Sequence, residues 1–370
     1  MKHCIFYLPY KLEKDGKRAR MVRPVKMIQA FQKIGYEVVC IDGYAVERKE
    51  KIRTLKQRIE SGERFDFMYA EASTMPMLLN EPHHIPTHPF VDASLFFYLN
   101  KKSIPIGLFY PDIYWRFPNY GEELAPWKKK IGLLNYQLDM KFFNRTLKAF
   151  YLPHRTMEHY LDVFPVIRKM KELPPGADDI SWKTNQIRCR DYSKNPLTVF
   201  YVGGIGHHYQ IRELLEAIRN VENCRGVICC RQEEWDRESA SLQSVLCDRI
   251  EIIHKSGDEL EPYYQKADLG ALLFQNMEYW SFAMPVKAFE YLAHELPMVA
   301  TKKTAIGDFV EKHSIGWAID NSSGEIQNLL EDLIAHPDKL QKKRERCSVV
   351  KGENTWTQRA KQVAEDLTHS

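Results

Sequence analysis

The sequence predicts an α/β protein that contains two doubly wound parallel sheets. Short apolar segments alternate with amphipathic helical patterns along the chain, which is typical of βαβ units. The alternation begins again after residue 196, as a second sheet would require. A length of 370 residues allows two domains of ordinary size, each with its own core. We therefore expect two Rossmann-like domains that face a cleft.

Each predicted strand is a run of apolar and β-branched residues bounded by polar or turn-forming residues. In the first half of the chain these runs occupy residues 3–10, 36–41, 65–70, 104–110 and 148–153. In the second half they occupy residues 197–202, 225–231, 249–254, 268–274 and 296–301. Helical patterns lie between the runs, for example over 23–35. A last helix is predicted over 354–367, with Asn354 or Thr355 as its cap.

A segment rich in proline and polar residues separates the two predicted domains. Residues 171–196 show little periodicity, which is typical of a domain boundary. The predicted organisation is an N-terminal domain over 1–172, a linker over 173–196, a C-terminal domain over 197–354 and a final helix over 355–370.

Composition and charge exclude several classes of protein. The formal net charge of +4 is too small for a typical nucleic-acid binder, so no nucleic-acid partner is expected. No run of about 18 apolar residues occurs, and the N-terminal apolar stretch is too short for a secretory signal, so a cytoplasmic location is predicted. The eight cysteines lack the spacing of zinc or redox sites. His83, His84 and His88 match no common zinc spacing either, and no metal site is predicted.

The first candidate site is a glycine turn that follows the predicted strand at 197–202. Gly203, Gly204 and Gly206 precede a helical pattern whose apolar residues have i, i+3, i+4, i+7 spacing. These apolar residues are Ile211, Leu214, Leu215 and Ile218. Unpaired amides at a helix N-terminus and the positive end of its dipole suit a phosphate group. The turn is not a Walker loop and falls short of the full dinucleotide fingerprint, so a plain strand-to-helix connection stays open.

The second candidate site lies in residues 278–301. Pro285 is suited to the first turn of a helix, and Lys287 and Glu290 stand three residues apart, hence on one helical face. A cation at the open end of a strand can hold a diphosphate, and a carboxylate one turn later can hold ribose hydroxyls. The spacing therefore indicates a nucleotide site, with a surface ion pair as the alternative.

At residues 284–301 the segment "MPVKAFEYLAHELPMVAT" resembles the donor site of the retaining nucleotide-sugar glycosyltransferases with the GT-B fold. Their bacterial polysaccharide members are especially similar. "LPPGAD" at 173–178 resembles the passage between the domains of these enzymes, and "NTWTQRA" at 354–360 resembles the helix that crosses back to the N-terminal domain. The resemblance covers residues 173–366 and is looser over the N-terminal half. There "YPDIYW" is similar to a His-Asp segment facing the cleft, with Pro111 where histidine is common.

The resemblance implies how a nucleotide sugar is bound. Glu290 would hold the ribose, while the diphosphate would contact Lys287 and Arg231 at the end of "GVICCR", together with the glycine turn. The donor site would also include Gly203, Gly204, Gly206, Met284 and Pro285.

The sequence departs from the family pattern at the sugar contact. Phe282 stands where many relatives have a second glutamate, so Glu278 or the backbone of 281–284 would contact the sugar. The usual Arg and Lys after the glycine turn are also missing, with His207, His208 and Tyr209 in their neighbourhood. A non-catalytic scaffold and a sugar-nucleotide epimerase therefore stay open as alternatives.

The resemblance implies transfer of a sugar from a UDP- or GDP-linked donor to a saccharide or lipid-linked saccharide of a surface polysaccharide or glycolipid. Retention of configuration is expected, and no further cofactor. No Asp-any-Asp triplet occurs, so independence of metal is also expected. Lys287 and Arg231 would stabilise the charge on the leaving diphosphate. Asp112 would orient or deprotonate the acceptor hydroxyl, with a capping role in a turn as the alternative.

Two segments suggest contact with a membrane. Residues 11–26 are strongly basic, which would suit an anionic acceptor, with a solvated loop as the alternative. Residues 126–143 place an apolar stripe beside three lysines, as in helices that lie in a membrane interface. The stripe contains Trp127, Ile131, Leu134, Leu138 and Phe142, and the lysines are Lys128, Lys129 and Lys130. A core-facing stripe is the alternative. With membrane contact, the protein would work at the inner face of the plasma membrane.

Overall fold

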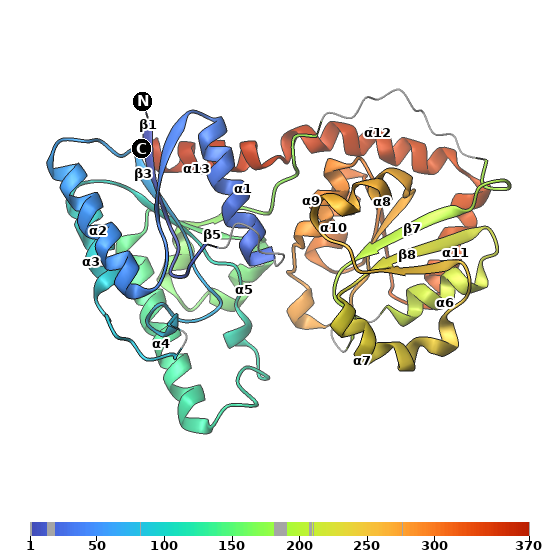
Figure 1. Ribbon diagram of the computed structural model, residues 1–370, viewed down its shortest axis with the longest axis horizontal. Coiled ribbons are helices and arrows are strands. Elements are labelled where there is room, and N and C mark those ends of the chain that lie inside the picture. The colour runs from blue at the N-terminus through green and yellow to red at the C-terminus, as the bar shows by residue number, and fades with distance from the viewer. Residues whose placement is uncertain are drawn as a thin grey trace. The chain divides into compact units, whose positions relative to one another are not determined.

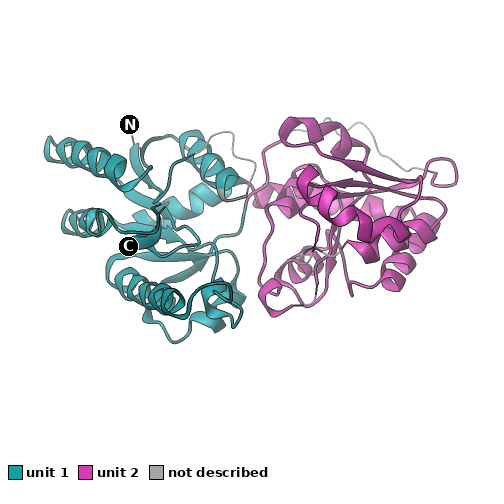
Figure 2. Ribbon diagram, turned by 60° about the horizontal axis from the view of Figure 1, so that its bottom comes forward, with its two compact units in different colours: residues 1–175, 356–370 teal, residues 176–355 magenta. Residues whose placement is uncertain are grey.

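The computed structural model describes residues 2–12, 19–81, 83–180, 191–206, 209, 211–275 and 277–369. The chain forms two compact units (Figure 2). Unit 1 contains residues 1–175 and 356–370, and unit 2 contains residues 176–355. The chain therefore passes between the units twice, after Pro175 and after Thr355.

Unit 1 contains a six-stranded parallel sheet with the strand order β2-β1-β3-β4-β5-β6. The strands are β1 Lys2–Tyr7, β2 Tyr36–Ile41, β3 Phe67–Glu71, β4 Ile106–Phe109, β5 Ala149–Leu152 and β6 Met170–Glu172. The first five were predicted. The edge strand β6 was not, because the sequence Met-Lys-Glu gives no apolar run.

The helices of unit 1 include the last helix of the chain (Figure 1). They are α1 Ala19–Lys33, α2 Ala45–Glu60, α3 Val91–Lys101, α4 Pro126–Thr146, α5 Glu158–Leu161 and α13 Trp356–Thr368. Helix α13 packs on α1, β3 and β4 because it buries an apolar face with helical spacing. That face contains Trp356, Ala360, Val363 and Leu367.

Unit 2 contains a second six-stranded parallel sheet with the order β12-β11-β10-β7-β8-β9. Its strands are β7 Leu197–Val202, β8 Cys224–Cys229, β9 Ile250–Ile253, β10 Leu269–Leu272, β11 Met298–Thr301 and β12 Gly316–Ile319. The predicted strand at 197–202 coincides with β7. The edge strand β12 was not predicted, because it is a run of only four residues.

Helices cover both faces of the second sheet (Figure 1). They are α6 Arg212–Asn220, α7 Gln232–Leu242, α8 Glu261–Lys266, α9 Val286–Ala293, α10 Ala305–His313, α11 Ser323–Ala335 and α12 Asp338–Glu353. One apolar core joins the sheet to α8, α9, α10 and α12, and the other joins it to α6, α7, α11 and the first turn of α12. The predicted α/β fold with two doubly wound sheets is confirmed.

The strand order places a topological switch point between β7 and β10 in unit 2. Ligands of open α/β sheets bind beyond the carboxyl ends of the strands at such a point. The glycine turn follows β7 and the loop 273–285 follows β10, so both predicted donor segments leave the same edge of the sheet. In the part of the chain that the structure describes, no helix is long and apolar enough to cross a bilayer.

Candidate functional site

The glycine turn after β7 is held by its own neighbours. The Gly203 amide donates to the carbonyl of Cys229 at 3.0 Å, and the Ile205 amide donates to Glu234 Oε2 at 3.2 Å. The Tyr201 hydroxyl donates to the Gly204 carbonyl at 2.5 Å. Within the described residues, no group accepts a hydrogen bond from the Gly204 amide. A carboxylate therefore takes one of the amide positions where a phosphate was expected.

The glycines are required by close contacts inside the turn. A Cβ atom on Gly203 would lie 2.8 Å from the Tyr201 hydroxyl, and one on Gly204 would lie 2.9 Å from the Tyr209 ring. Gly206 has a φ of 117°, which only glycine adopts at little cost. His207 and His208 lie outside the described residues.

Arg231 lies next to the glycine turn because β8 pairs with β7. It is the N-cap residue of α7, and its Nη1 contacts Glu234 Oε1 at 2.7 Å. The Arg231 side chain is 61% exposed, whereas that of Glu234 is 15% exposed. Glu234 thus bridges Arg231 and the Ile205 amide, and its negative charge partly offsets the positive charge of Arg231.

The predicted pair on α9 is formed. Lys287 Nζ lies 2.5 Å from Glu290 Oε2, and both side chains are about one third exposed, at 33% and 27%. The opposite face of α9 is buried. Pro285 lies one position earlier than predicted, because it is the N-cap residue with a ψ of 138° and the helix begins at Val286.

A tyrosine that the sequence analysis did not identify completes this pair. The Tyr264 hydroxyl donates to Glu290 Oε2 at 2.6 Å. Burial of the phenol, and next the negative charge of Glu290, raise the pKa of Tyr264 well above its ordinary value, so the hydroxyl remains a donor. The ring of Tyr264 stacks on His294 at 4.0 Å between centroids and 12° between planes.

The loop between β10 and α9 lacks the second carboxylate of the family pattern. Phe282 is only 5% exposed and its ring packs edge-on against Tyr279 at 5.4 Å. Met284 is also buried, at 8%, so only its backbone could face a ligand. Glu278 begins the short 3₁₀ turn Glu278–Trp280 and is exposed. It is therefore the accessible carboxylate of this loop.

Asp112 lies in unit 1, after β4. Its Oδ1 accepts a hydrogen bond from the Tyr114 amide at 2.8 Å, at the start of the 3₁₀ turn Tyr114–Arg116. This is the capping arrangement that the sequence left open as an alternative. The carboxylate is partly exposed.

The histidines of the 83–88 loop have local partners. His83 Nδ1 accepts from the Ile85 amide at 3.1 Å, and His84 Nδ1 lies 2.9 Å from the Leu79 carbonyl. Across the described ranges, no three or more His, Cys, Asp or Glu side chains are placed to hold a metal ion.

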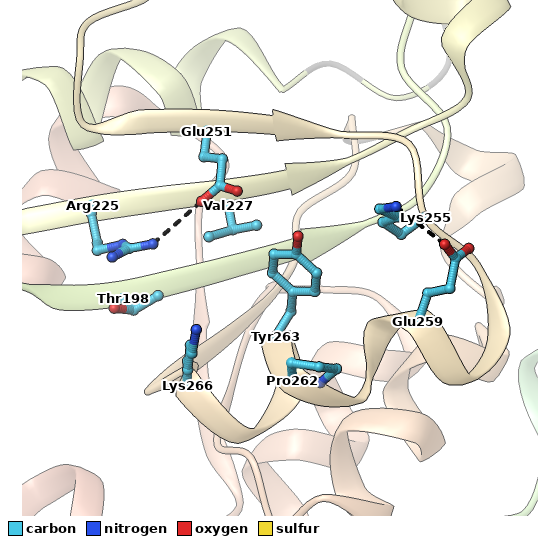
Figure 3. A pocket seen from close by; sticks show the side chains of 9 residues that line it. All are labelled: Thr198, Arg225, Val227, Glu251, Lys255, Glu259, Pro262, Tyr263 and Lys266. Carbon is cyan, nitrogen blue, oxygen red and sulfur yellow. Dashed lines mark hydrogen bonds and ion pairs between the residues drawn. The ribbon is translucent and has the colours of Figure 1, made fainter.

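A separate cavity of about 330 Å³ lies between α8 and strands β7, β8 and β9 (Figure 3). Two ion pairs line it, Arg225 with Glu251 at 3.4 Å and Lys255 with Glu259 at 3.1 Å. Tyr263 also lines this cavity, whereas the adjacent Tyr264 contacts Glu290. Two consecutive residues of α8 therefore contact two different sites, Tyr263 the cavity and Tyr264 the Glu290 carboxylate.

Helix α4 has the predicted apolar stripe on its exposed side. Trp127, Ile131, Leu134 and Leu138 are 61%, 45%, 55% and 49% exposed. Phe142 does not belong to this surface, because its ring packs on Phe96 and Phe97 at 5.3 and 5.6 Å.

The basic segment 11–26 is described only in part. Residues 13–18 lie outside the described residues, as do the side chains of residues 19 and 20. The prediction of a basic surface over 11–26 is wrong for Arg23. This residue is 5% exposed, and its guanidinium lies 3.5 Å from the centre of the Phe109 ring. Its Nε pairs with the buried Glu71 at 3.4 Å. Arg23 is therefore a core residue of unit 1.

Comparisons with known proteins agree with the arrangement of the second unit. Residues 196–336 match the family model described as "Glycosyl transferases group 1". No protein in the curated set matches the sequence.

Solved structures of similar fold cover nearly the whole chain. Anabaena Alr3699/HepE, in complex with UDP and glucose, has a TM-score of 0.64 at 14% identity, with 99% of each chain covered. Sucrose-phosphate synthase from Thermosynechococcus elongatus has a TM-score of 0.61 at 13% identity, with 98% of each chain covered. WaaG, a glycosyltransferase involved in lipopolysaccharide biosynthesis, has a TM-score of 0.60 at 11% identity, covering 99% of this chain and 100% of its own. At these identities the likeness establishes the fold.

Proposed function

We propose that this chain, which carries a group 1 glycosyltransferase domain on a GT-B fold, transfers a sugar from a UDP- or GDP-linked donor to a saccharide or lipid-linked saccharide. The observation that carries this proposal is the Lys287–Glu290 pair at the start of α9. It lies inside the matched segment 196–336, near the switch point of the second sheet.

In the proposed donor site, positively charged side chains would bind the diphosphate and a carboxylate would bind the ribose. Lys287 would neutralise the diphosphate as negative charge builds on it during departure from the sugar, and Arg231 would assist from the end of β8. Glu290 would accept hydrogen bonds from the ribose hydroxyls. The protein's own cations would thus do the work of a metal ion, and no metal or further cofactor is proposed.

We propose that the reaction retains the configuration of the sugar. The acceptor hydroxyl would attack from the face that the diphosphate leaves, and a phosphate oxygen would help to take its proton. This course needs no carboxylate nucleophile.

UDP is the first nucleotide to test. HepE, which shares the fold, has been solved with UDP and with UDP-glucose. WaaG, which also shares the fold, is described as acting in lipopolysaccharide biosynthesis. These likenesses favour a UDP-sugar as donor and a surface polysaccharide or glycolipid as product.

The exposed stripe of α4 supports a lipid-linked acceptor at the inner face of the plasma membrane. Four large apolar side chains with lysines beside them suit the interface of an anionic bilayer. The inner side of the same helix holds the loop after β3, because the Tyr136 hydroxyl donates to the Thr74 carbonyl at 2.6 Å. A bilayer under α4 would therefore lie close to loops at the carboxyl edge of the first sheet.

The second candidate function is a non-catalytic scaffold of the same fold. Phe282 favours it, because the site lacks one carboxylate that many relatives use. A scaffold would bind polysaccharide and would show no turnover of any nucleotide sugar.

The test is a thermal-shift series with UDP, GDP, ADP and CMP, followed by their common sugars. A nucleotide that binds only the native protein raises the melting temperature in step with the logarithm of its concentration over Kd. We expect UDP or GDP to stabilise the wild type, and Glu290→Ala to abolish the shift. Glu331→Ala, on the exposed side of α11, is the matched control and should keep it. Equal shifts in wild type and Glu290→Ala would place the donor site elsewhere, whereas no shift with any nucleotide would favour the scaffold.

A further inference from the structure

The two oxygens of the Glu290 carboxylate have unequal surroundings. Oε2 accepts from the Tyr264 hydroxyl at 2.6 Å and from Lys287 Nζ at 2.5 Å. No group in the described part of the chain hydrogen-bonds to Oε1. Each carboxylate oxygen offers about two lone-pair positions. Oε2 is therefore filled by the protein, whereas both positions of Oε1 are left for other donors.

The two donors on Oε2 differ in how firmly they are held. Lys287 is a long, flexible side chain that is 33% exposed. The Tyr264 ring is 5% exposed and makes edge contacts with Phe200 at 5.2 Å and Tyr291 at 6.0 Å. Its remaining face stacks on His294 at 4.0 Å. The phenol therefore has one orientation, and its hydroxyl is fixed on Glu290.

His294 is itself fixed at both ring nitrogens. Nδ1 lies 2.7 Å from the Glu290 carbonyl, and Nε2 lies 2.9 Å from Glu261 Oε2. The His294 side chain is 7% exposed and that of Glu261 is 41% exposed. A chain of contacts thus runs from the surface at Glu261 through His294 and Tyr264 to the Glu290 carboxylate.

We infer that Tyr264 is a positioning residue that turns Oε1 of Glu290 toward the vicinal hydroxyls of the donor's ribose. This inference rests on the proposed function, in which Lys287 moves to the diphosphate. Once Lys287 has done so, Tyr264 is the donor that still holds Oε2. Two ribose hydroxyls match the two free positions on Oε1, so the network selects a ribonucleotide over its 2′-deoxy form.

The inference is tested with Tyr264→Phe, which removes the hydroxyl and keeps the stacked ring. Kd for UDP and for 2′-deoxy-UDP is measured by calorimetry, or for the two guanosine forms if the wild type binds GDP. The wild type should prefer the ribonucleotide about 10-fold or more. In Tyr264→Phe the ribonucleotide should bind about 10-fold more weakly, and the preference should fall toward one. The matched control Tyr263→Phe changes the adjacent ring, which lines the cavity of Figure 3, and should keep both values within about 2-fold.

The preference separates positioning from a merely structural role. A general loss of structure would weaken both nucleotides equally and leave their ratio unchanged, which would overturn the inference. In a Glu290→Gln background, Tyr264→Phe should add little, because the two residues act as one unit. If Tyr264→Phe folds poorly, Glu261→Gln provides a second variant at an exposed position. It should lower the preference for the ribonucleotide about 2- to 3-fold. An unchanged preference would contradict the inference.

The outcomes for the two proposals are distinguishable. If Glu290→Ala leaves nucleotide binding intact, the donor site of the proposed function is wrong and the inference falls with it. If Glu290→Ala abolishes binding but Tyr264→Phe keeps the ribose preference, the donor site stands and the positioning role of Tyr264 is wrong.

Discussion

Asp139 Oδ2 accepts a hydrogen bond from the Met77 amide at 2.8 Å, so a carboxyl of α4 holds the loop that follows β3. Asp139 is buried, and burial raises its pKa from 3.8 to about 7, with the negative charge of Asp92 adding to the shift. The hydrogen bond from Met77 offsets only part of this effect. The loop after β3 is therefore tied to a group that titrates near neutral pH.

The first prediction concerns stability against pH. Because the pKa of Asp139 is higher in the folded state, the folded state binds more protons between about pH 4 and 7. Stability should fall as pH rises through this window and level off above it, by up to about 4 kcal/mol for this group. Asp139→Asn, whose amide oxygen can still accept from Met77, should gain stability relative to the wild type as pH rises from 5 to 8. Urea unfolding at both values measures this, and parallel pH profiles would contradict it.

The second prediction concerns the buried ion pair of Arg48 and Asp92. Arg48 is 2% exposed and contacts Asp92 through Nε and Nη2 at 2.9 and 2.8 Å. Arg48→Met leaves a buried charge without its partner, so a loss of about 3–5 kcal/mol is expected. Arg53→Met removes an exposed pair with Glu50 on the same helix and should cost less than about 1 kcal/mol. Urea unfolding compares the two variants. Equal losses in the free energy of unfolding would show that the buried pair contributes no more to stability than the exposed pair.

The third prediction concerns the carboxylate at the glycine turn. Glu234 pairs with Arg231 and accepts from the Ile205 amide. Its negative charge should oppose a diphosphate, so Glu234→Gln should bind UDP a few-fold more tightly, while Arg231→Ala should bind it more weakly. The effect of Arg231→Ala should shrink at high salt, because the Arg231 side chain is 61% exposed. Calorimetry at two ionic strengths measures both effects. Tighter binding by Arg231→Ala would remove this arginine from the donor site.

The fourth prediction concerns the exposed stripe of α4. Leu134→Asp puts a charge at a position that is 55% exposed, so stability should change little. Co-sedimentation with phosphatidylglycerol vesicles should fall about 10-fold, because the charge would be forced into the bilayer interface. Val349→Asp on α12, at a position 58% exposed, is the control and should bind as the wild type does. Equal binding by both variants would exclude α4 as the membrane surface.

Local patterns in the sequence were enough for the elements that build the site. The strand at 197–202 and the buried face of α6 follow from short-range periodicity, and both occur in the structure. The contact of Lys287 with Glu290 also follows from local geometry, because residues three apart on a helix are neighbours. The sequence analysis missed the edge strands β6 and β12, because runs of three or four residues are too short to show a period.

The contacts between residues far apart in the sequence depend on packing across the sheet. Tyr264 meets Glu290 across 26 residues of sequence, and Glu234 meets the Ile205 amide across 29, and no local pattern encodes either contact. Arg23 is charged, as surface residues usually are, yet the packing of unit 1 places it over the Phe109 ring in the core. The sequence by itself determined the fold class and the charged pair on α9, since both depend on neighbours a few residues apart. Only the tertiary structure decided which groups surround that pair, because those contacts join helices that distant strands bring together.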